Sequence, residues 1–473
     1  MKLLFKNPLL LFSISFFLLL ILPRLLSHGM FFDGVTYASI ARNLAIGAGS
    51  FWKLHYTDVV FPICYEHTPL GFWLQSLAFR LFGDSVRIEA FYGLFMGILT
   101  VLIACIFWRI LFPDKARQAW FPILLFSVFP ITSWIYANNL LENTMTIFTT
   151  FAALAGYMSA KSNQWFKRIF WGLLSAMAII SAFLTKGPVG LFPMVVPIVA
   201  MIFISEIPFR NGIVAFAYVA LFSALIFVLI FSQKEAYEFL KIYLGKQVMA
   251  SVQGTREHVS SHFFILKRLF LECIVPIMTA GALQFIFRKS AKVNFSRKFL
   301  FLLSIAIAGS FPLIVSYKQQ WWYMFPSLPF YAMVFSALFI EAGENLENRI
   351  IHNRTMKSAL IAVSLLMFVG ANIAMIADRD TIRKEAKFHG DFTVQKLQIS
   401  FGQRISVCPA SLETDWPLVA NMARQFGASL TKEQGCEYLL VAKDLQCPIP
   451  DYCRKIHPSE ARNFILYKCK SGK

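Results

Sequence analysis

Asp33 is the residue whose type and position point most directly to chemistry. It lies in the run FFDGVTYASIAR, a few residues after the first apolar segment. A carboxylate beside a membrane is costly to desolvate, about 2.5 to 3.5 kcal/mol at the bilayer centre, so it is a functional candidate by default. A carboxylate in this position could act as a general base. The alternative is that Asp33 only caps a short helix beginning near Val35.

Other polar residues adjoin apolar segments, and nearly all fall on one side of the membrane in the topology derived below. They are Asn138, Asn139, Glu142, Lys186, Arg256, His262 and Lys318. Acids and bases gathered at one membrane face, under two surface loops, indicate a cavity. Such a cavity could hold a charged headgroup while the lipid tail stays in the bilayer.

These residues also have structural interpretations. Glu142 could only pair with a base, and Lys186 and Lys318 could extend from helix ends to the membrane surface. His258 and His262 are four residues apart and could bind a metal, but no further ligand of clear spacing accompanies them. Two other basic residues could be ordinary interfacial cations, Arg42 and Arg87.

The elements that position these residues are membrane helices. Of the 473 residues, 57% are hydrophobic and 15% charged, and the mean hydropathy is +0.59, outside the range of soluble domains. Apolar stretches long enough to cross about 30 Å of hydrocarbon recur, at about 8–27, 88–112, 118–136, 140–159, 169–185, 189–205, 211–231, 263–287, 299–316, 322–340 and 358–377. We therefore expect a polytopic α-helical membrane protein with about eleven transmembrane helices, because lipid offers backbone groups no partner.

The distribution of basic residues predicts the orientation. Lys2 and Lys6 precede the first span and no small-residue cleavage site follows Leu22, so we interpret this span as an uncleaved anchor. With the N-terminus inside, the inner connections hold most of the loop lysines and arginines, as the positive-inside rule requires. The net charge of +19 partly reflects this topology, and its spread along the chain does not indicate nucleic-acid binding.

The chain divides into a transmembrane part, 1–378, and a soluble part, 379–473. Two long outer loops, 28–87 and 232–262, carry amphipathic segments that we expect to be surface helices: Ala38–Leu44, Leu70–Leu81 and Ala236–Val248. The soluble part predicts a small α/β domain, with strands at 405–407, 437–442 and 463–468 and a helix at 416–426. An odd number of spans places this domain outside the cytoplasm.

Five of the eight cysteines lie in the last stretch: Cys408, Cys436, Cys447, Cys453 and Cys469. Cysteine enrichment in an exported domain fits an oxidising compartment. If the first two strands are parallel, Cys408 and Cys436 lie at opposite edges of the sheet, too far apart to bond. Cys436 with Cys469 and Cys447 with Cys453 are the better candidates; the alternative is that all five are free thiols.

Several motifs together resemble one family. Asp33 with Tyr37 and Arg42 is followed by EHTPLGFWL at 66–74, LTKGPVG at 184–190, and Lys318 with Tyr323, Pro326 and Pro329. This order resembles the GT-C glycosyltransferases of the protein O-mannosyltransferase and lipid A aminoarabinose transferase superfamily. The resemblance covers nearly all of the membrane part. It implies a GT-C fold in a bacterial inner membrane, with a cytoplasmic N-terminus and a periplasmic C-terminal domain.

The resemblance also implies a reaction. A sugar linked through phosphate to a polyprenyl chain would pass to an acceptor outside the cytoplasm, with inversion at the anomeric carbon. Asp33 would be the base that activates the acceptor, and Lys186, Lys318 and Arg256 would stabilise the departing phosphate. The supporting residues would be Arg42, Glu66, His67, Glu142, His262 and Tyr323. No cofactor is required, although a divalent metal near Glu66 or His262 is possible.

Two departures from the family pattern bear on the site. Many relatives carry a second acid directly after the first, where this chain has Gly34, so Asp33 is the sole carboxylate at that spot. Thr68 replaces the first proline of a Pro-Pro pair, which alters local stiffness. Lipid A or another envelope glycolipid is the expected acceptor, and an exported protein is the alternative. A lipid flippase or transporter is the rival class. It would show charges near the midplane and paired broken helices, whereas the charged residues here cluster at one face and no inverted repeat is apparent. A non-catalytic lipid-binding scaffold is the third class.

Overall fold

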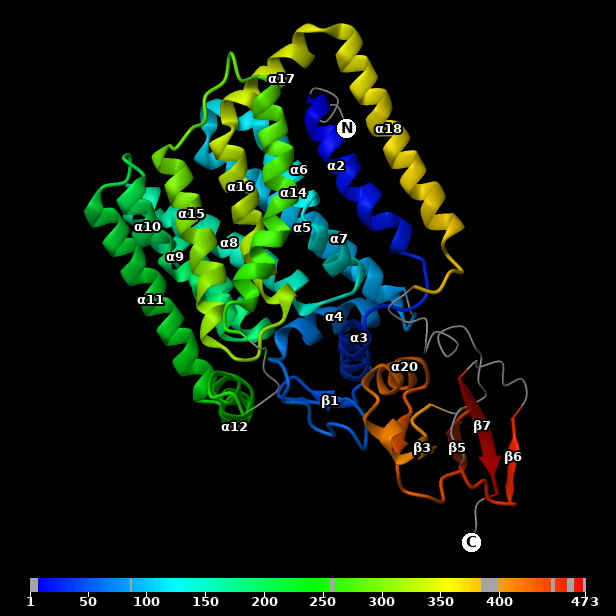
Figure 1. Ribbon diagram of the computed structural model, residues 1–473. Helices are drawn as coiled ribbons and strands as arrows, with labels where there is room; N and C mark the ends of the chain where they lie inside the picture. Colours follow the sequence, from blue (N-terminus) through cyan, green and yellow to red (C-terminus); the bar gives the residue numbers. More distant parts are fainter. Residues whose placement is uncertain are drawn as a thin grey trace.

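The computed structural model describes residues 7–470 except 86, 256–258, 260, 384–398, 400, 444–446 and 457–462. Helices make up most of the first 377 residues (Figure 1). In chain order these helices are α2 (Pro8–Ile21), η1 (Leu22–Arg24), α3 (Phe32–Ala45), α4 (Leu70–Phe82), α5 (Ile88–Leu111), η2 (Pro113–Ala119), α6 (Trp120–Ser127), α7 (Pro130–Ala137), α8 (Leu141–Lys161), α9 (Trp165–Lys186), η3 (Pro188–Val195), α10 (Val196–Phe203), α11 (Phe209–Phe231), α12 (Lys234–Tyr243), η4 (Leu244–Met249), α13 (Ala250–Val252), α14 (Phe264–Ile286), α15 (Arg297–Ser310), η5 (Phe311–Val315), η6 (Trp321–Ser327), α16 (Leu328–Leu338), α17 (Ile340–His352) and α18 (Arg354–Ala377).

Each apolar stretch predicted from the sequence coincides with helical structure. Within the described residues, six helices are long and apolar enough to cross a membrane, or eight if two sharply bent pairs are each one span. The bent pairs are Pro113–Ser127 with Pro130–Ala137, at 79°, and Trp321–Leu338 with Ile340–His352, at 75°. The protein is therefore a multi-pass helical membrane protein. The structure gives fewer candidate spans than the eleven expected, because α2 and α10 are short and α8 carries many polar residues.

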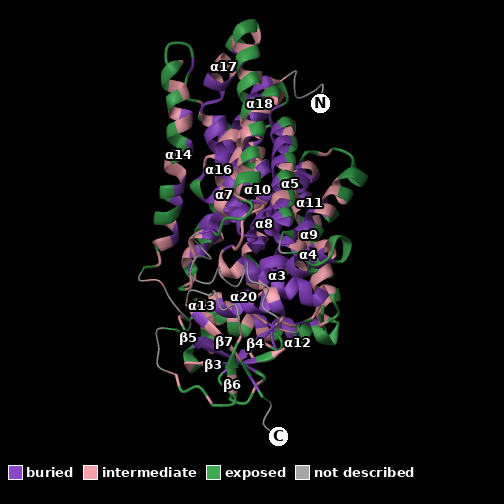
Figure 2. Cartoon of the chain, turned by 90° about the vertical axis from the view of Figure 1, so that its right-hand side faces the viewer, coloured by how far each residue is buried: buried purple, intermediate pink, exposed green. Residues whose placement is uncertain are grey.

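Burial separates the core of the bundle from its lipid-facing helices. Residues along nearly the whole of α8 are buried, whereas most residues of α11 and α18 are not, although both are strongly apolar (Figure 2). In α8 the hydroxyl groups of Thr146 and Thr150 donate to backbone carbonyls one turn earlier, so these buried polar groups are satisfied within the helix. Ser175 of α9 donates to the carbonyl of Ala152 at 2.9 Å, which joins the two helices.

The two long loops form helices at one end of the bundle. The predicted segments Ala38–Leu44 and Leu70–Leu81 lie in α3 and α4, and a short hairpin of β1 (Gly49–Ser50) and β2 (Lys53–Leu54) joins them. The segment expected around Ala236–Val248 is α12, which continues into the π-helix η4. Figure 1 shows α3, α4 and α12 at the same end of the bundle as the C-terminal sheet, with the N-terminus and α17 at the other end.

The C-terminal residues form a five-stranded mixed sheet in the order β4-β3-β5-β7-β6. Its strands and helices are β3 (Arg404–Cys408), η8 (Ala410–Thr414), α20 (Trp416–Phe426), β4 (Ser429–Thr431), β5 (Tyr438–Ala442), β6 (Cys453–Lys455) and β7 (Phe464–Cys469). The parallel pairing of β3 with β5, the helix α20 and the strand β7 confirm the expected elements. The sequence analysis missed β4 and β6, which have only three residues each.

The disulfide pairing expected from the sequence is wrong. Cys408 bonds Cys447 and Cys453 bonds Cys469, whereas Cys436 is free. Because β3 and β5 run parallel, Cys408 at the end of β3 lies at the same edge of the sheet as the end of β5, five residues before Cys447. Cys453 faces Cys469 directly in the register of β6 with β7, a pairing that depends on the missed strand.

Two buried arginines fasten this sheet domain to the membrane bundle. Arg424 of α20 donates from Nε and Nη2 to the two carboxylate oxygens of Glu89 in α5, at 3.0 and 3.2 Å, and from Nη1 to Asp84 at 2.8 Å. Arg42 of α3 donates to the backbone carbonyls of Ala423 and Arg424, at 2.8 and 3.0 Å. The sheet domain is therefore held against α3, the helix that carries Asp33.

Candidate active site

Asp33 lies in the first turn of α3, which begins at Phe32 and has no side-chain cap. The alternative that Asp33 only caps a helix starting near Val35 is therefore wrong. The Asp33 side chain is partly accessible to solvent but surrounded by protein atoms, so burial raises its pKa to about 6. Among the described residues, no side chain hydrogen-bonds or ion-pairs with its carboxylate, which leaves it available to a ligand.

The charges that act on Asp33 identify its neighbours. The cations Lys186 and Lys318 oppose the rise of its pKa. The carboxylates of Glu142 and Glu66 add to the rise. The structure thus brings together, around one acid, four residues from separate parts of the chain that the sequence analysis selected.

Asn138 and Asn139 hold the start of α3 in place. The Asn138 side chain accepts from the backbone N–H of Phe31 at 2.7 Å, and the Asn139 amide donates to the carbonyl of Gly34 at 3.1 Å. Asn139 has a φ of +51°, a left-handed conformation that asparagine tolerates better than most residues. These contacts on both sides of Asp33 fix the direction of its backbone.

Glu142 and Lys186 form a buried ion pair next to Asp33. Glu142 lies in the first turn of α8 and Lys186 ends α9, and the Lys186 Nζ lies 2.6 Å from Glu142 Oε1. The ammonium also lies 5.0 Å from the centre of the Tyr323 ring and 5.9 Å from that of Tyr37. The second oxygen of Glu142 is buried and has no hydrogen-bond partner among the described residues. Two aromatic rings and one carboxylate thus hold the ammonium in a fixed position.

Gly187 follows the last residue of α9 and has a φ of +83°. A Cβ at this position would lie 2.0 Å from the Tyr243 hydroxyl. That hydroxyl donates to the carbonyl of Lys186 at 3.4 Å. Only glycine fits between Lys186 and α12, so the motif around Lys186 has a steric reason for its glycine.

Two other predicted residues, His67 and Glu66, each hydrogen-bond to a side chain from another segment. The His67 Nε2 is 2.9 Å from the Tyr37 hydroxyl, so the two side chains share a hydrogen bond. The Gln247 amide donates to Glu66 Oε1 at 2.6 Å. Gln247 belongs to η4, and the sequence analysis missed it. A π-helix has no clear sequence pattern, so the only available signal was the position of Gln247 in the second outer loop.

Known sequences and solved structures are similar to this chain. A sequence profile described as dolichyl-phosphate-mannose-protein mannosyltransferase matches residues 66–233. The undecaprenyl phosphate-alpha-4-amino-4-deoxy-L-arabinose arabinosyl transferase of Yersinia pestis (strain Pestoides F) is 21% identical over 388 residues, which are 80% of this chain and 68% of that protein. The crystal structure of ArnT from Cupriavidus metallidurans bound to undecaprenyl phosphate has a TM-score of 0.64 at 15% identity and covers 98% of this chain and 97% of its own.

The chain resembles the ArnT-like GT-C glycosyltransferases. The fold extends beyond bacterial ArnT: the oligosaccharyltransferase of Archaeoglobus fulgidus in the apo form matches with a TM-score of 0.50 at 11% identity, over 91% of this chain and 69% of its own. The match to ArnT spans the membrane helices and the C-terminal sheet domain together, since it covers nearly the whole chain.

Not every predicted residue reaches Asp33. Arg42 is buried and its guanidinium is committed to Asn43 and to the carbonyls at the end of α20, so it positions the sheet domain. The His262 Nδ1 lies 2.9 Å from the carbonyl of Ile314, and its ring packs on Tyr317 at 4.1 Å. His262 therefore supports the segment that precedes Lys318. Arg256 and His258 lie outside the described residues.

The structure offers no ready metal site in the part of the chain that it describes. No three His, Cys, Asp or Glu side chains gather closely enough there to hold a metal ion. Glu66 uses one oxygen for Gln247, and His262 directs one ring nitrogen to a backbone carbonyl. The involvement of a divalent metal stays a prediction.

Proposed function

We propose that this protein is an integral-membrane glycosyltransferase that moves a sugar from a polyprenyl-phosphate donor to lipid A or lipopolysaccharide. The observation that carries the proposal is the uncommitted carboxylate of Asp33 beside the Lys186–Glu142 pair and Lys318. The donor class is taken from the arabinosyl transferase of Yersinia pestis and from the undecaprenyl phosphate named with the structure of ArnT. The position of the charges at one end of an apolar bundle suits a donor that combines a charged headgroup with a lipid tail.

The proposed topology has eleven spans in a bacterial inner membrane. The N-terminus is cytoplasmic, and the Asp33 end of the bundle and the C-terminal sheet domain are periplasmic. The basic connections between the spans support this orientation through the positive-inside rule. A lipid-linked donor can reach a periplasmic site, where nucleotide sugars are absent.

In the proposed reaction, an acceptor oxygen attacks the anomeric carbon while the bond from that carbon to the donor phosphate breaks. Asp33 orients the acceptor and takes its proton where it carries one, a role worth roughly 10² to 10⁴ in rate. The bonding electrons leave with the polyprenyl phosphate. Attack opposite the leaving group inverts the anomeric configuration.

The cations near Asp33 are suited to the leaving phosphate. Lys186 is held rigidly by Glu142 and by the Tyr37 and Tyr323 rings, so little reorganisation is needed when charge develops. Lys318 adds a second positive charge in the same electrostatic neighbourhood. We assign Glu142 the role of orienting Lys186 rather than of acid or base.

An exported protein is the second candidate acceptor. The match of residues 66–233 to the mannosyltransferase profile favours it. The two candidates share the donor chemistry and the role of Asp33, and they differ only in what carries the accepting oxygen.

The test is a reconstitution of the purified protein in liposomes with undecaprenyl-phosphate aminoarabinose and lipid A, followed by mass spectrometry of the lipids. We expect a mass increase of lipid A that is lost in Asp33→Asn. The matched control is Asp58→Asn, which changes an exposed acid of the same outer loop whose backbone N–H, not its side chain, contacts the sheet domain. Sugar transfer that persists in Asp33→Asn would exclude the general-base role.

The same liposomes distinguish the other functions. Unmodified lipid A together with a modified exported protein would favour the protein acceptor. Movement of the donor between leaflets with no transfer product would instead indicate a flippase.

A further inference from the structure

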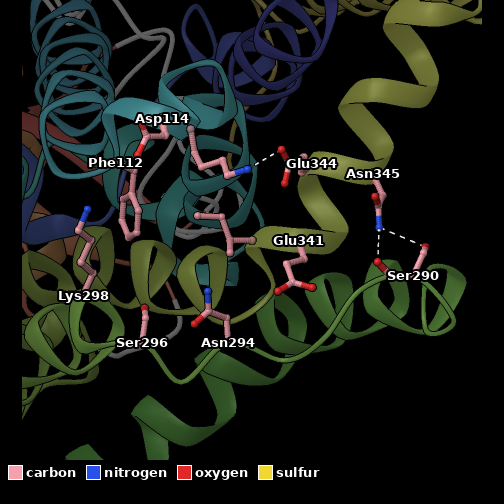
Figure 3. A pocket seen from close by; sticks show the side chains of 11 residues that line it. Phe112, Asp114, Ser290, Asn294, Ser296, Lys298, Glu341, Glu344 and Asn345 are labelled. Carbon is pink, nitrogen blue, oxygen red and sulfur yellow. Dashed lines mark hydrogen bonds and ion pairs between the residues drawn. The ribbon is translucent and has the colours of Figure 1, made fainter.

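A polar pocket of about 470 Å³ lies at the end of the bundle away from Asp33. The residues that characterise it are Phe112, Asp114, Asn294, Ser296, Lys298 and Glu341. They follow the end of α5, precede or open α15, and start α17 (Figure 3). Glu89, where the sheet domain docks, is 22 residues before the last residue of α5, so the pocket is about 33 Å from Glu89 along this helix. The candidate membrane helices α5, α14 and α15 all end or begin near it, so it lies at a membrane boundary.

Some of the charged side chains that line this pocket are paired, and others are not. Lys115 pairs with Glu344, and one oxygen of Glu341 accepts from the backbone N–H of Lys292 at 2.7 Å. Asp114 and Lys298 form no ion pair or side-chain hydrogen bond within the described residues. The Lys298 Nζ lies 5.2 Å from the centre of the Phe112 ring, on the same side of the pocket as Ser296 (Figure 3).

A second cavity of about 340 Å³ adjoins the first and shares Ser290 with it. Its lining combines Phe285 and Ile286, both about two-thirds exposed, with Arg288 and Lys289. The Arg288 guanidinium lies 4.6 Å from the centre of the Phe285 ring. Apolar rings beside cations at the end of a membrane helix suit the glycerol, acyl and phosphate parts of a phospholipid.

We propose that the two cavities bind an aminophospholipid from the leaflet at this face. The primary ammonium lies between Asp114 and Glu341, the phosphodiester beside Arg288 and Lys289, and the acyl chains along Phe285 and Ile286. The charge count favours a zwitterionic headgroup: once Lys115 has neutralised Glu344, the first pocket keeps two carboxylates and one ammonium. An anionic headgroup would face both carboxylates, and a quaternary ammonium has no N–H group to donate to them.

The lipid comparison uses the purified full-length protein, stripped of lipid in detergent, with binding followed by native mass spectrometry. The probes are phosphatidylethanolamine, phosphatidylcholine and phosphatidylglycerol with matched chains, and water-soluble glycerophosphoethanolamine. We expect phosphatidylethanolamine to bind at least tenfold more tightly than the other three. Equal binding of phosphatidylcholine would overturn the role of the ammonium. Equally tight binding of glycerophosphoethanolamine would assign the pocket to a free phosphodiester instead of a lipid.

The variant comparison tests the named residues. Asp114→Asn is expected to weaken phosphatidylethanolamine binding about tenfold, the usual scale for one hydrogen bond to a charged group. Arg288→Met is expected to weaken phosphatidylethanolamine and phosphatidylglycerol alike. The matched control is Glu206→Gln, an exposed acid at the same face, where Arg297 contacts Ser205. Variants that bind like Glu206→Gln would overturn the proposal. The lipid comparison with the unmodified protein decides the question even if a variant misfolds.

Discussion

Gly34 lies directly against the backbone carbonyl of Asn138. A Cβ at position 34 would be 1.9 Å from the Asn138 oxygen, far inside van der Waals contact. The second acid that the family resemblance would place at this position therefore has no room in the packing of this chain. Position 34 cannot carry a second acid next to Asp33, because the first turn of α3 packs against the turn that ends α7.

Gly34→Ala should consequently disturb the active site without touching any charged group. We expect a destabilisation of about 1 to 3 kcal/mol, the usual cost of overpacking, and a loss of transfer activity as Asp33 shifts. Thermal unfolding and the liposome transfer assay measure the two effects. Gly370→Ala in α18 is the control, because a Cβ there meets nothing within 4 Å. Full activity of Gly34→Ala would show that the position of Asp33 does not depend on this contact.

The pKa of Asp33 predicts the pH dependence of the reaction. Because burial raises this pKa to about 6 and a general base works in its deprotonated form, kcat/KM should rise with pH up to about 6 and then level off. At pH 5 we expect roughly one tenth of the plateau value. The measurement is kcat/KM between pH 4.5 and 8 at constant ionic strength.

Lys318→Met provides a second readout of the same titration. Lys318 lowers the pKa of Asp33, so its removal should move the midpoint of the pH profile upward. A midpoint that stays fixed would place the titrating group elsewhere.

The buried Glu142–Lys186 pair allows stability to be separated from catalysis. Lys186→Met leaves a buried carboxylate without its partner, which typically costs about 3 to 5 kcal/mol. The double variant Glu142→Gln with Lys186→Met removes both charges and should recover much of the stability. It should still lose about 10² to 10³ in kcat, because the cation for the leaving phosphate is gone. Recovery of both stability and activity in the double variant would make the pair purely structural.

The sequence predicted elements whose patterns are local. Each apolar stretch coincides with a helix, and Asp33, Glu142, Lys186 and Lys318 could be selected because a charge next to an apolar segment is conspicuous. What the sequence could not predict depends on the packing of distant segments. Arg42 resembles any interfacial cation until α20 supplies its two carbonyl partners, more than 380 positions later.

The disulfides show the same limit at shorter range. The sequence suggested Cys447 as the partner of Cys453, whereas the actual partner of Cys453 is set by its register with β7. Peptide mapping under non-reducing conditions should therefore recover Cys408 with Cys447 and Cys453 with Cys469, and a thiol reagent should label Cys436 in the same protein. A peptide that joins Cys436 to Cys469 would contradict this pairing.

The last prediction concerns how the sheet domain is attached. Arg424→Met leaves the buried Glu89 and the partly exposed Asp84 without their shared guanidinium, so we expect a loss of about 3 to 5 kcal/mol, or local detachment of the domain if the bundle stays folded. Hydrogen exchange distinguishes these results, because detachment would increase exchange in α3 and α20 only.

Adding Glu89→Gln to Arg424→Met should restore part of the protection from exchange, since the remaining amide is less costly to bury than a charge. Arg404→Met, at an exposed position of the same domain, is the control and should leave exchange in α3 unchanged. Because α3 carries Asp33, increased exchange there should accompany a fall in transfer, whereas a fully active Arg424→Met with a mobile α3 would show that domain docking is not needed for the reaction.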